Sequence, residues 1–257
     1  MRPSILQLPI LLLSCKFSLL ASLLVIRAIL QRLLTLPPAG SGKTRTLTAR
    51  VAYLLAHHGY SPSDVIVATF TVKAAREMQE RIGKLIGNGL ERKLILGTFH
   101  SIARRYLVRY GHLIGLKKGF GIADGNDSLA IIKRVIKRNQ ATIDAGSARS
   151  RISHIKAQGL SFDDYVMKNE KATKKDVGAQ EFLVVYREYQ DGLEQANLLD
   201  YDDLLLRCVD LLKAHPEVTK NVEVVLVDEF QDTNLVQFDL MRGFAKWRKR
   251  VTIVGDP

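Results

Sequence analysis

The sequence has very few cysteines. Only Cys15 and Cys208 occur among its 257 residues, and they stand at neither a metal-ligand nor a redox spacing. A disulfide framework and a cysteine-ligated metal site are therefore excluded, and a reducing compartment is indicated. Both thiols are expected to serve as small apolar side chains.

Acidic residues are missing from the beginning of the chain. None precedes Asp64, and residues 5–30 are almost wholly apolar, with Lys16 and Arg27 as their only charges. Three explanations stand for this atypical apolar leader, residues 1–32. A membrane-spanning helix would be long enough, but a lysine near its middle costs about 2.5–3.5 kcal/mol. A mitochondrial presequence fits the absence of acids and the scattered basic residues. A leader foreign to the domain, from a wrong start or splice, is favoured because residues 33–36 must already form a buried strand.

Basic residues are in excess, 38 against 26 acidic ones, which gives a formal net charge of +12. Between Ser101 and Lys175, 16 lysines and arginines accompany only 6 acidic residues. This surplus indicates a polyanionic partner, although lysine-rich helices also serve simply as solvated surfaces. The hydrophobic content of 47% is ample for the core of one large domain or two small ones.

A short apolar strand, residues 33–36, leads into the sequence Pro-Pro-Ala-Gly-Ser-Gly-Lys-Thr. This order of strand, glycine-rich turn and Gly-Lys-Thr predicts a phosphate-binding loop. Gly40 and Gly42 let backbone N–H groups point at phosphate oxygens, because no Cβ blocks the approach. Lys43 then reaches the β- and γ-phosphates, and the Thr44 hydroxyl can ligate Mg²⁺. An amphipathic pattern follows, so the loop precedes a helix N-terminus, where anions are favoured.

Strands and helices alternate between residues 33 and 110. Residues 65–70 and 94–98 are continuous apolar runs, typical of buried parallel strands, and a helical pattern follows each of them. This predicts an α/β fold with a parallel sheet that carries the phosphate loop at its carboxyl edge. From Gly111 to about residue 195, glycines and then helical stretches replace the alternation, which predicts a mostly helical insertion.

A second motif lies near the end of the chain, where the largely apolar run 222–227 leads into Asp228 and Glu229. A parallel strand would place both carboxylates at the sheet edge that carries Lys43. Asp228 is then expected to hold Mg²⁺, and Glu229 to polarise the water that attacks the γ-phosphate. Gln231 can orient that water and report hydrolysis.

These motifs resemble those of the UvrD/Rep-like superfamily 1 DNA helicases, and the similarity covers residues 33–257. Six motifs stand in the family's order, which makes the resemblance specific. They are Ala39-Gly40-Ser41-Gly42-Lys43-Thr44-Arg45-Thr46-Leu47, Thr69-Phe70-Thr71-Val72-Lys73-Ala74-Ala75, Gly97-Thr98-Phe99-His100-Ser101, Asp200-Tyr201-Asp202-Asp203-Leu204-Leu205, Asp228-Glu229-Phe230-Gln231-Asp232-Thr233-Asn234 and Val254-Gly255-Asp256-Pro257.

The resemblance implies a RecA-like P-loop NTPase domain, residues 33–110 and 196–257, interrupted by an inserted, mostly helical subdomain at 111–195. ATP and Mg²⁺ are the implied cofactors, and single-stranded DNA and duplex junctions are the implied partners. No membrane partner is expected. The implied site residues are Ala39, Gly40, Ser41, Gly42, Lys43, Thr44 and Arg45 for the nucleotide, Thr44 and Asp228 for the metal, Lys43, Glu229 and Gln231 for catalysis, and Phe70, Thr98 and His100 for DNA.

The resulting hypothesis is the N-terminal ATP-binding region of an ATP-dependent DNA helicase. The resemblance implies a second RecA-like domain, absent from this sequence, whose arginines complete the ATP site. Without them hydrolysis is expected to be slower by about 10³–10⁵, by analogy with arginine fingers. The alternative is a non-enzymatic remnant that binds single-stranded nucleic acid or regulates. A P-loop kinase, a GTPase-like switch and a membrane-tethered ATPase fit less well. A nuclear or cytoplasmic location is expected, and the acid-free leader leaves a mitochondrial one open.

Overall fold

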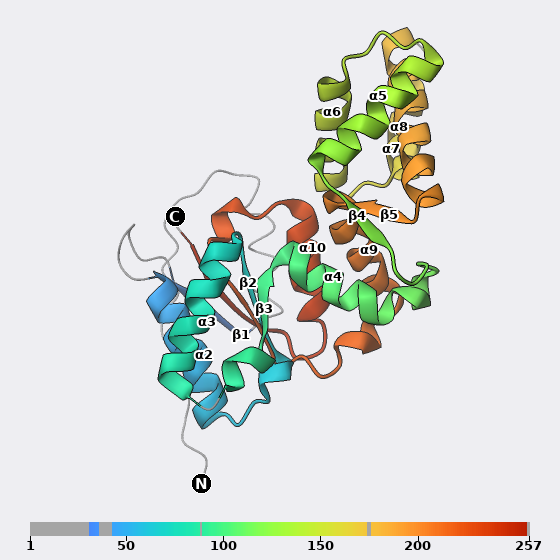
Figure 1. Cartoon of the computed structure of the whole chain (residues 1–257). Coiled ribbons are helices and arrows are strands. Elements are labelled where there is room, and N and C mark those ends of the chain that lie inside the picture. The colour runs from blue at the N-terminus through green and yellow to red at the C-terminus, as the bar shows by residue number, and fades with distance from the viewer. Residues whose placement is uncertain (1–30, 36–42, 88, 174–175, 256–257) are drawn as a thin grey trace. The chain divides into compact units, whose positions relative to one another are not determined.

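The computed structural model describes residues 31–35, 43–87, 89–173 and 176–255, which form two compact units (Figure 1). Unit 1 comprises Met1–Leu96, Val222–Asp232 and Trp247–Pro257, and unit 2 comprises Gly97–Asn221 and Thr233–Lys246. The predicted leader comprises residues 1–32. Its residues 1–30 lie outside the described ranges, and residues 31 and 32 are the first two residues of the first strand. Within those ranges no helix is both long enough and apolar enough to cross a bilayer.

A five-stranded sheet lies at the centre of unit 1. Its strands are β1 (Gln31–Thr35), β2 (Val65–Thr69), β3 (Ile95–Thr98), β6 (Val224–Val227) and β7 (Arg250–Val254). Their order is β1-β7-β6-β2-β3, and the pairs β1 with β7, β7 with β6 and β6 with β2 are parallel. Leu226 is aligned with Val67 on one side and with Thr252 on the other. The predicted parallel α/β sheet is thus confirmed.

Helices α2 (Lys43–His57) and α3 (Val72–Ile86) pack against each other and share one apolar core with the strands. Their spacing of apolar residues explains this, because Leu47, Val51 and Leu54 recur on one face of α2 and are buried. Short 3₁₀ turns complete the unit: η1 (Pro62–Asp64), η2 (Leu90–Lys93) and η5 (Phe230–Asp232).

Unit 2 contains two groups of helices. In the first group, α4 (Phe99–Tyr110), α9 (Tyr201–Ala214) and α10 (Leu235–Phe244) pack on one another. The rings of Tyr106 and Phe244 lie 4.9 Å apart in this core. The turns η3 (Gly111–Ile114) and η4 (Pro216–Thr219) flank α9.

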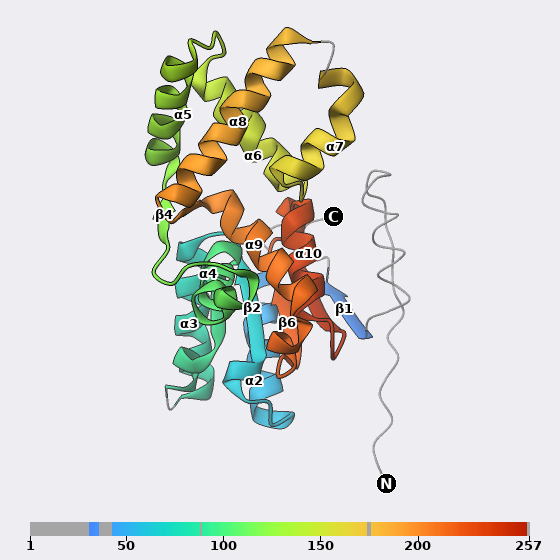
Figure 2. The same cartoon turned by 90° about the vertical axis from the view of Figure 1, so that its right-hand side faces the viewer.

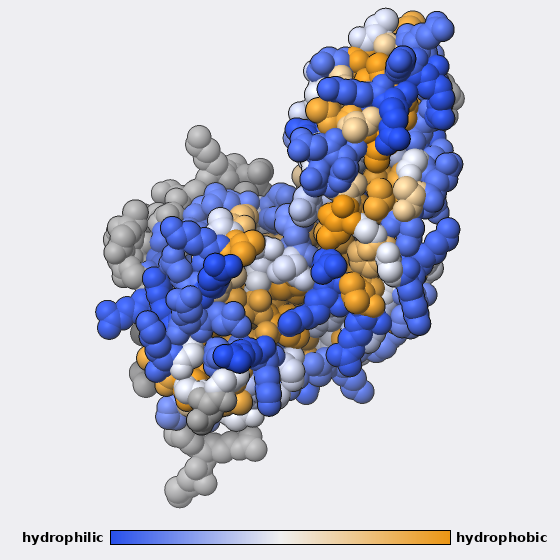
Figure 3. Space-filling model, in the orientation of Figure 1, coloured by the Kyte–Doolittle hydropathy of each residue, from blue (hydrophilic) through white to orange (hydrophobic). Residues whose placement is uncertain are grey.

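The second group consists of α5 (Gly125–Asn139), α6 (Ala145–Ala157), α7 (Phe162–Thr173) and α8 (Val177–Gln195), as Figure 2 shows. Its core contains Ile132, Ile152, Phe182 and Tyr186. On the face of unit 2 seen in Figure 3, hydrophilic residues cover the outside of these helices and hydrophobic residues lie between them. The helical stretches predicted between Gly111 and about residue 195 are present.

The chain enters the second group of helices through β4 (Gly121–Ala123) and leaves it through β5 (Leu198–Asp200). These two strands pair in parallel. Neither strand was predicted from the sequence, in which glycines punctuate the residues around β4. Each is three residues long and is stabilised by a partner distant in sequence, which no local pattern reveals. The compact units also join α4, α9 and α10 to α5–α8, whereas the predicted subdomain was 111–195; that subdomain boundary stays a prediction.

Candidate active site

The first turn of α2 carries the described part of the predicted phosphate-binding loop. Lys43 opens the helix and is only 9% exposed. Thr44 is half-buried, and its carbonyl oxygen accepts a hydrogen bond of 2.6 Å from the Thr48 hydroxyl. Arg45 is exposed. The predicted residues Ala39, Gly40, Ser41 and Gly42 lie outside the described ranges.

Asp228 follows the last residue of β6 and is 2% exposed. Its backbone N–H donates to the Ala68 carbonyl oxygen at 3.0 Å, which continues the pairing of β6 with β2. Burial raises the pKa of the Asp228 carboxyl group, and the charge of Glu229 raises it further; the Glu229 N–H and Lys43 act in the opposite direction. Because Lys43 acts on this carboxyl group, the structure brings two predicted site residues together.

The oxygen donors at this place suit a hard cation. The metal ligands predicted from the sequence are the Asp228 carboxylate and the Thr44 hydroxyl, and Mg²⁺ prefers oxygen ligands. A cation beside Asp228 would also offset the burial that disfavours the charged carboxylate. The two side chains therefore fit a magnesium ion in their chemistry.

Glu229 stands in a strained backbone conformation. Its φ is 48°, in the left-handed region that non-glycine residues rarely adopt, at a cost of about 1–3 kcal/mol. Its N–H donates to Asp228 Oδ1 at 3.1 Å, and its carbonyl oxygen accepts from the Asp232 N–H at 3.0 Å. Because of this tight turn the two adjacent carboxylates point in different directions. Asp228 is buried, whereas Glu229 is half-buried.

Gln231 contacts the predicted catalytic carboxylate directly. Its Nε2 donates to Glu229 Oε2 at 2.6 Å. Gly255, directly after β7, makes room for this amide, because a Cβ at Gly255 would lie 2.5 Å from Gln231 Oε1 and 3.2 Å from the Phe230 nitrogen. Gly255 was assigned no role of its own from the sequence, although a glycine directly after a buried strand signals a close approach.

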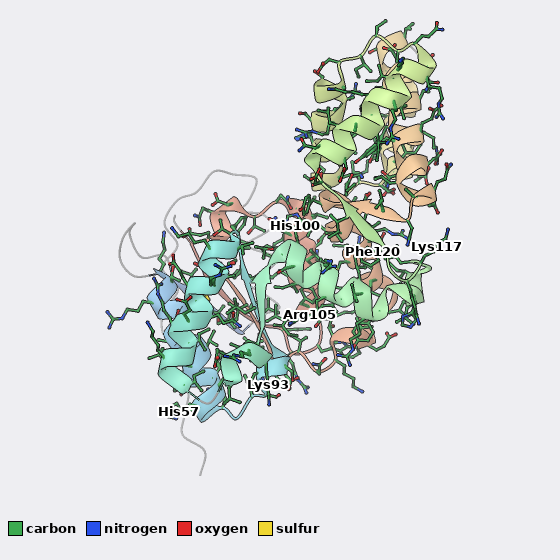
Figure 4. The ribbon with its side chains drawn as sticks, in the orientation of Figure 1. His57, Lys93, His100, Arg105, Lys117 and Phe120 are labelled. Atoms are coloured by element: carbon green, nitrogen blue, oxygen red, sulfur yellow. The ribbon has the colours of Figure 1, made fainter. Side chains whose placement is uncertain are left out.

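The residues predicted to contact DNA are distributed over both units. Phe70 is half-buried directly after β2 in unit 1. Thr98 and His100 lie at the start of α4 in unit 2, where the Thr98 hydroxyl caps the helix by accepting from the Ser101 N–H at 3.2 Å. Burial lowers the pKa of His100, against the charge of Asp202, and its ring lies edge-on to Tyr201 at 5.8 Å. Figure 4 labels His100 at this helix end.

One lysine of the basic segment is buried rather than available to a polyanion. Lys156 is 1% exposed, and its Nζ lies 2.6 Å from Asp200 Oδ2 and 2.7 Å from Asp203 Oδ1. The Tyr189 hydroxyl also donates to Asp200, at 2.8 Å. Charge counting could not detect this, because the ion pairs join residues more than 40 positions apart.

Comparison with known proteins gives a family match and several relatives of the chain. The family model of the UvrD/REP helicase N-terminal domain matches residues 22–257, so the match begins upstream of residue 33, where the resemblance was expected to start. The chain is 43% identical over 235 residues to the ATP-dependent DNA helicase srs2 of Schizosaccharomyces pombe. The matched region covers 85% of this chain and 26% of that protein.

Two other relatives give similar values. Identity is 39% over 243 residues to the ATP-dependent DNA helicase SRS2 of Saccharomyces cerevisiae, covering 85% of this chain and 20% of the relative. It is 37% over 228 residues to the ATP-dependent DNA helicase PcrA of Staphylococcus aureus, covering 87% and 31%. The chain thus spans between a fifth and a third of the length of these relatives.

Proposed function

Because this chain belongs to the UvrD/REP helicase N-terminal domain family, we propose that it is the ATP-binding region of an ATP-dependent DNA helicase. The relatives named above are ATP-dependent DNA helicases, and the chain matches about a fifth to a third of each. Unwinding and movement along DNA would be activities of a complete helicase that contains this region. ATP binding is the part of the cycle that residues of this chain would carry.

The observation that carries the proposal is the electrostatic interaction between two buried residues, Lys43 and Asp228. Lys43 is buried at the N-terminus of α2, and its charge acts on a carboxyl group that is itself 2% exposed. A buried cation at a helix N-terminus suits phosphate oxygens, and a buried carboxylate beside it suits the accompanying cation. When bound, Mg²⁺ would neutralise charge on the phosphates. Thr44 and Asp228 are the side chains proposed to hold it.

Glu229 is proposed to accept the proton of the attacking water. Its carboxylate is half-buried and is held through one oxygen, Oε2, by the Gln231 amide. A base oriented in this way keeps its other oxygen for a water molecule. The Gln231 side chain would exchange its contact with Glu229 for one with the γ-phosphate when ATP is bound. This exchange would couple the nucleotide state to the turn η5.

Single-stranded DNA is proposed as the polyanionic partner. Phe70, Thr98 and His100 would supply stacking and backbone contacts, and the basic surplus between residues 101 and 175 would supply attraction to phosphates. Duplex junctions are the substrate that a helicase containing this region would encounter.

The decisive test measures Mg·ATP affinity and ATP hydrolysis by this purified chain, with and without single-stranded DNA. We expect Mg·ATP to bind, and Lys43→Ala to weaken binding by at least tenfold. Glu229→Gln should retain binding, because its shape is conserved and only the proton acceptor is lost. Equal Mg·ATP affinity of the wild-type chain and Lys43→Ala would contradict the proposed site.

A non-enzymatic single-strand-binding or regulatory remnant is the second candidate, since the basic surplus between residues 101 and 175 would suit a nucleic acid whether or not ATP is hydrolysed. The same assay separates the two. Hydrolysis above the level of Glu229→Gln, even when slow, supports the enzyme, and DNA stimulation would add to that support. DNA binding without any ATP binding would support the remnant.

A further inference from the structure

A row of rings and arginines lies at the amino edge of the unit 1 sheet, opposite the candidate active site. The strands are parallel, so their amino ends share one edge. Helix α2 ends there at His57, Tyr60 precedes β2, and β7 begins there at Arg250. Figure 4 shows His57 at this end of α2. We call the group the amino-edge patch; it consists of Arg50, Tyr53, His57, His58, Tyr60, Arg248, Lys249 and Arg250.

The rings of the patch form a row in which neighbouring rings contact each other. The ring of Tyr53 lies 5.0 Å from that of His57 and 5.3 Å from that of His58, and His58 lies 5.6 Å from Tyr60. Tyr53 is 47% exposed, and both histidines are exposed as well. These three exposed rings are in contact with one another, whereas exposed apolar side chains on a protein surface are usually scattered singly.

An arginine stands over each end of the row. The guanidinium carbon of Arg50 lies 5.7 Å from the centre of the Tyr53 ring, and that of Arg250 lies 5.7 Å from the centre of the Tyr60 ring. Arg250 also donates to the Tyr60 hydroxyl at 2.6 Å, which fixes this ring against the sheet edge. The Tyr60 ring is thus held in place before any partner arrives, which reduces the entropy cost of binding to it.

The patch carries an excess of positive charge. Glu223 orients two of its arginines, because Oε1 accepts from Arg248 at 2.8 Å and Oε2 from Arg250 at 2.9 Å. The side chain of Arg248 remains 50% exposed. Lys249 is exposed and makes no ion pair with the residues that the structure describes. The patch itself contains three arginines and one lysine and no acid, and Glu223 is paired with two of these cations.

We propose that the amino-edge patch is a second binding surface for single-stranded nucleic acid. Exposed ring faces accept unpaired bases, and the flanking cations accept phosphates, the combination that proteins use for single strands. A duplex hides its base faces, and an acidic peptide would use the cations but leave the rings unused. The surface is separate from the proposed track at Phe70, because Tyr60 and Phe70 flank opposite ends of β2, whose five residues span about 15 Å.

The experiment that tests this is photocrosslinking of the purified chain to an eight-nucleotide thymidine strand that contains 4-thiothymidine, with peptides mapped by mass spectrometry. Crosslinks are expected within residues 50–60, whether or not others form near Phe70 or His100. Tyr53→Ala combined with His57→Ala should remove these crosslinks and reduce affinity for the strand about fivefold or more, since each stacked base contributes strongly. Both side chains are exposed, so the melting temperature should stay unchanged.

Charge variants supply the matched control. Lys249→Glu should lower the slope of log affinity against log salt by about 0.7 or more, the value for one phosphate contact on a single strand. Lys213→Glu makes the same charge change at an exposed position of α9 and should leave the crosslinks at residues 50–60 unchanged.

Three results would overturn the proposal. The first is the absence of any crosslink within residues 50–60, and the second is that Lys213→Glu reduces these crosslinks as much as Lys249→Glu does. The third is displacement of the strand by polyglutamate at equal charge, which would indicate a surface for acidic peptides. The proposed ATP site is tested separately, because Mg·ATP affinity is measured without nucleic acid. In His100→Ala, persistent crosslinks at residues 50–60 would distinguish the patch from the proposed DNA track.

Discussion

Asp228 is held where its own charge is disfavoured. Burial and the neighbouring Glu229 both raise its pKa, and Glu229 itself stands at a φ of 48°. Strain and disfavoured charge of this kind lower the stability of a fold, and they persist at sites where a ligand relieves them. The two residues that were predicted from the sequence as metal ligand and base are therefore each destabilising in the unliganded chain, one through a disfavoured charge and one through backbone strain.

Asp228→Asn is expected to stabilise the unliganded chain and to remove its response to Mg·ATP. The pKa of Asp228 is raised in the folded state, so the folded chain loses stability as pH rises above the unfolded value, near 3.9. Asparagine removes that penalty and can still accept from the Glu229 N–H. Thermal melts should show a gain of about 2–4 °C at pH 7 that shrinks toward pH 4, on the order of 1 kcal/mol.

Asp232→Asn is the matched control, because Asp232 is an exposed acid of the same turn. It should change the melting temperature little and keep the Mg·ATP response. A lower melting temperature for Asp228→Asn at pH 7 would mean that the attraction to Lys43 outweighs burial, contrary to this argument.

At the scale of elements, Lys156 joins three parts of unit 2. It lies in α6 and pairs with Asp200, which ends β5 and caps α9, and with Asp203 in the first turn of α9. Burial lowers the pKa of Lys156, but the charges of Asp203 and Asp200 outweigh burial and raise it on balance. The insertion helices and α9 are thus connected through one buried ion cluster.

Lys156→Met should destabilise this connection by about 3–5 kcal/mol, because it leaves two buried carboxylates without their cation. Hydrogen exchange measured by mass spectrometry should become faster in α6, β5 and the start of α9. Adding Asp200→Asn and Asp203→Asn should restore much of the protection, since asparagine also caps a helix well. Lys168→Met removes an exposed lysine of α7 and should change nothing. Unchanged exchange in Lys156→Met would show that the cluster contributes no stability.

At the scale of the whole molecule, the sequence predicted the features that local pattern determines. Apolar runs such as 65–70 and 222–227 marked strands of the parallel sheet, and Asp228 was correctly expected after a strand. What it could not predict depends on distant partners. Strands β4 and β5 stabilise each other across 75 or more residues, and Lys156 acquires its role only when α6 reaches α9. The left-handed Glu229 has no local signature either.

The placement of the candidate site makes a last prediction about the whole chain. Lys43, Asp228, Glu229 and Gln231 all belong to unit 1, and so does Gly255. A nucleotide held by these residues should slow hydrogen exchange in the first turns of α2 and in residues 228–232, because it orders the groups that contact it. Exchange of α5–α8, in unit 2, should stay unchanged. Mass spectrometry with and without a non-hydrolysable Mg·ATP analogue measures this, with Lys43→Ala as the control that should lose the protection. Protection confined to residues 125–195 would place the nucleotide on the other unit and refute the site.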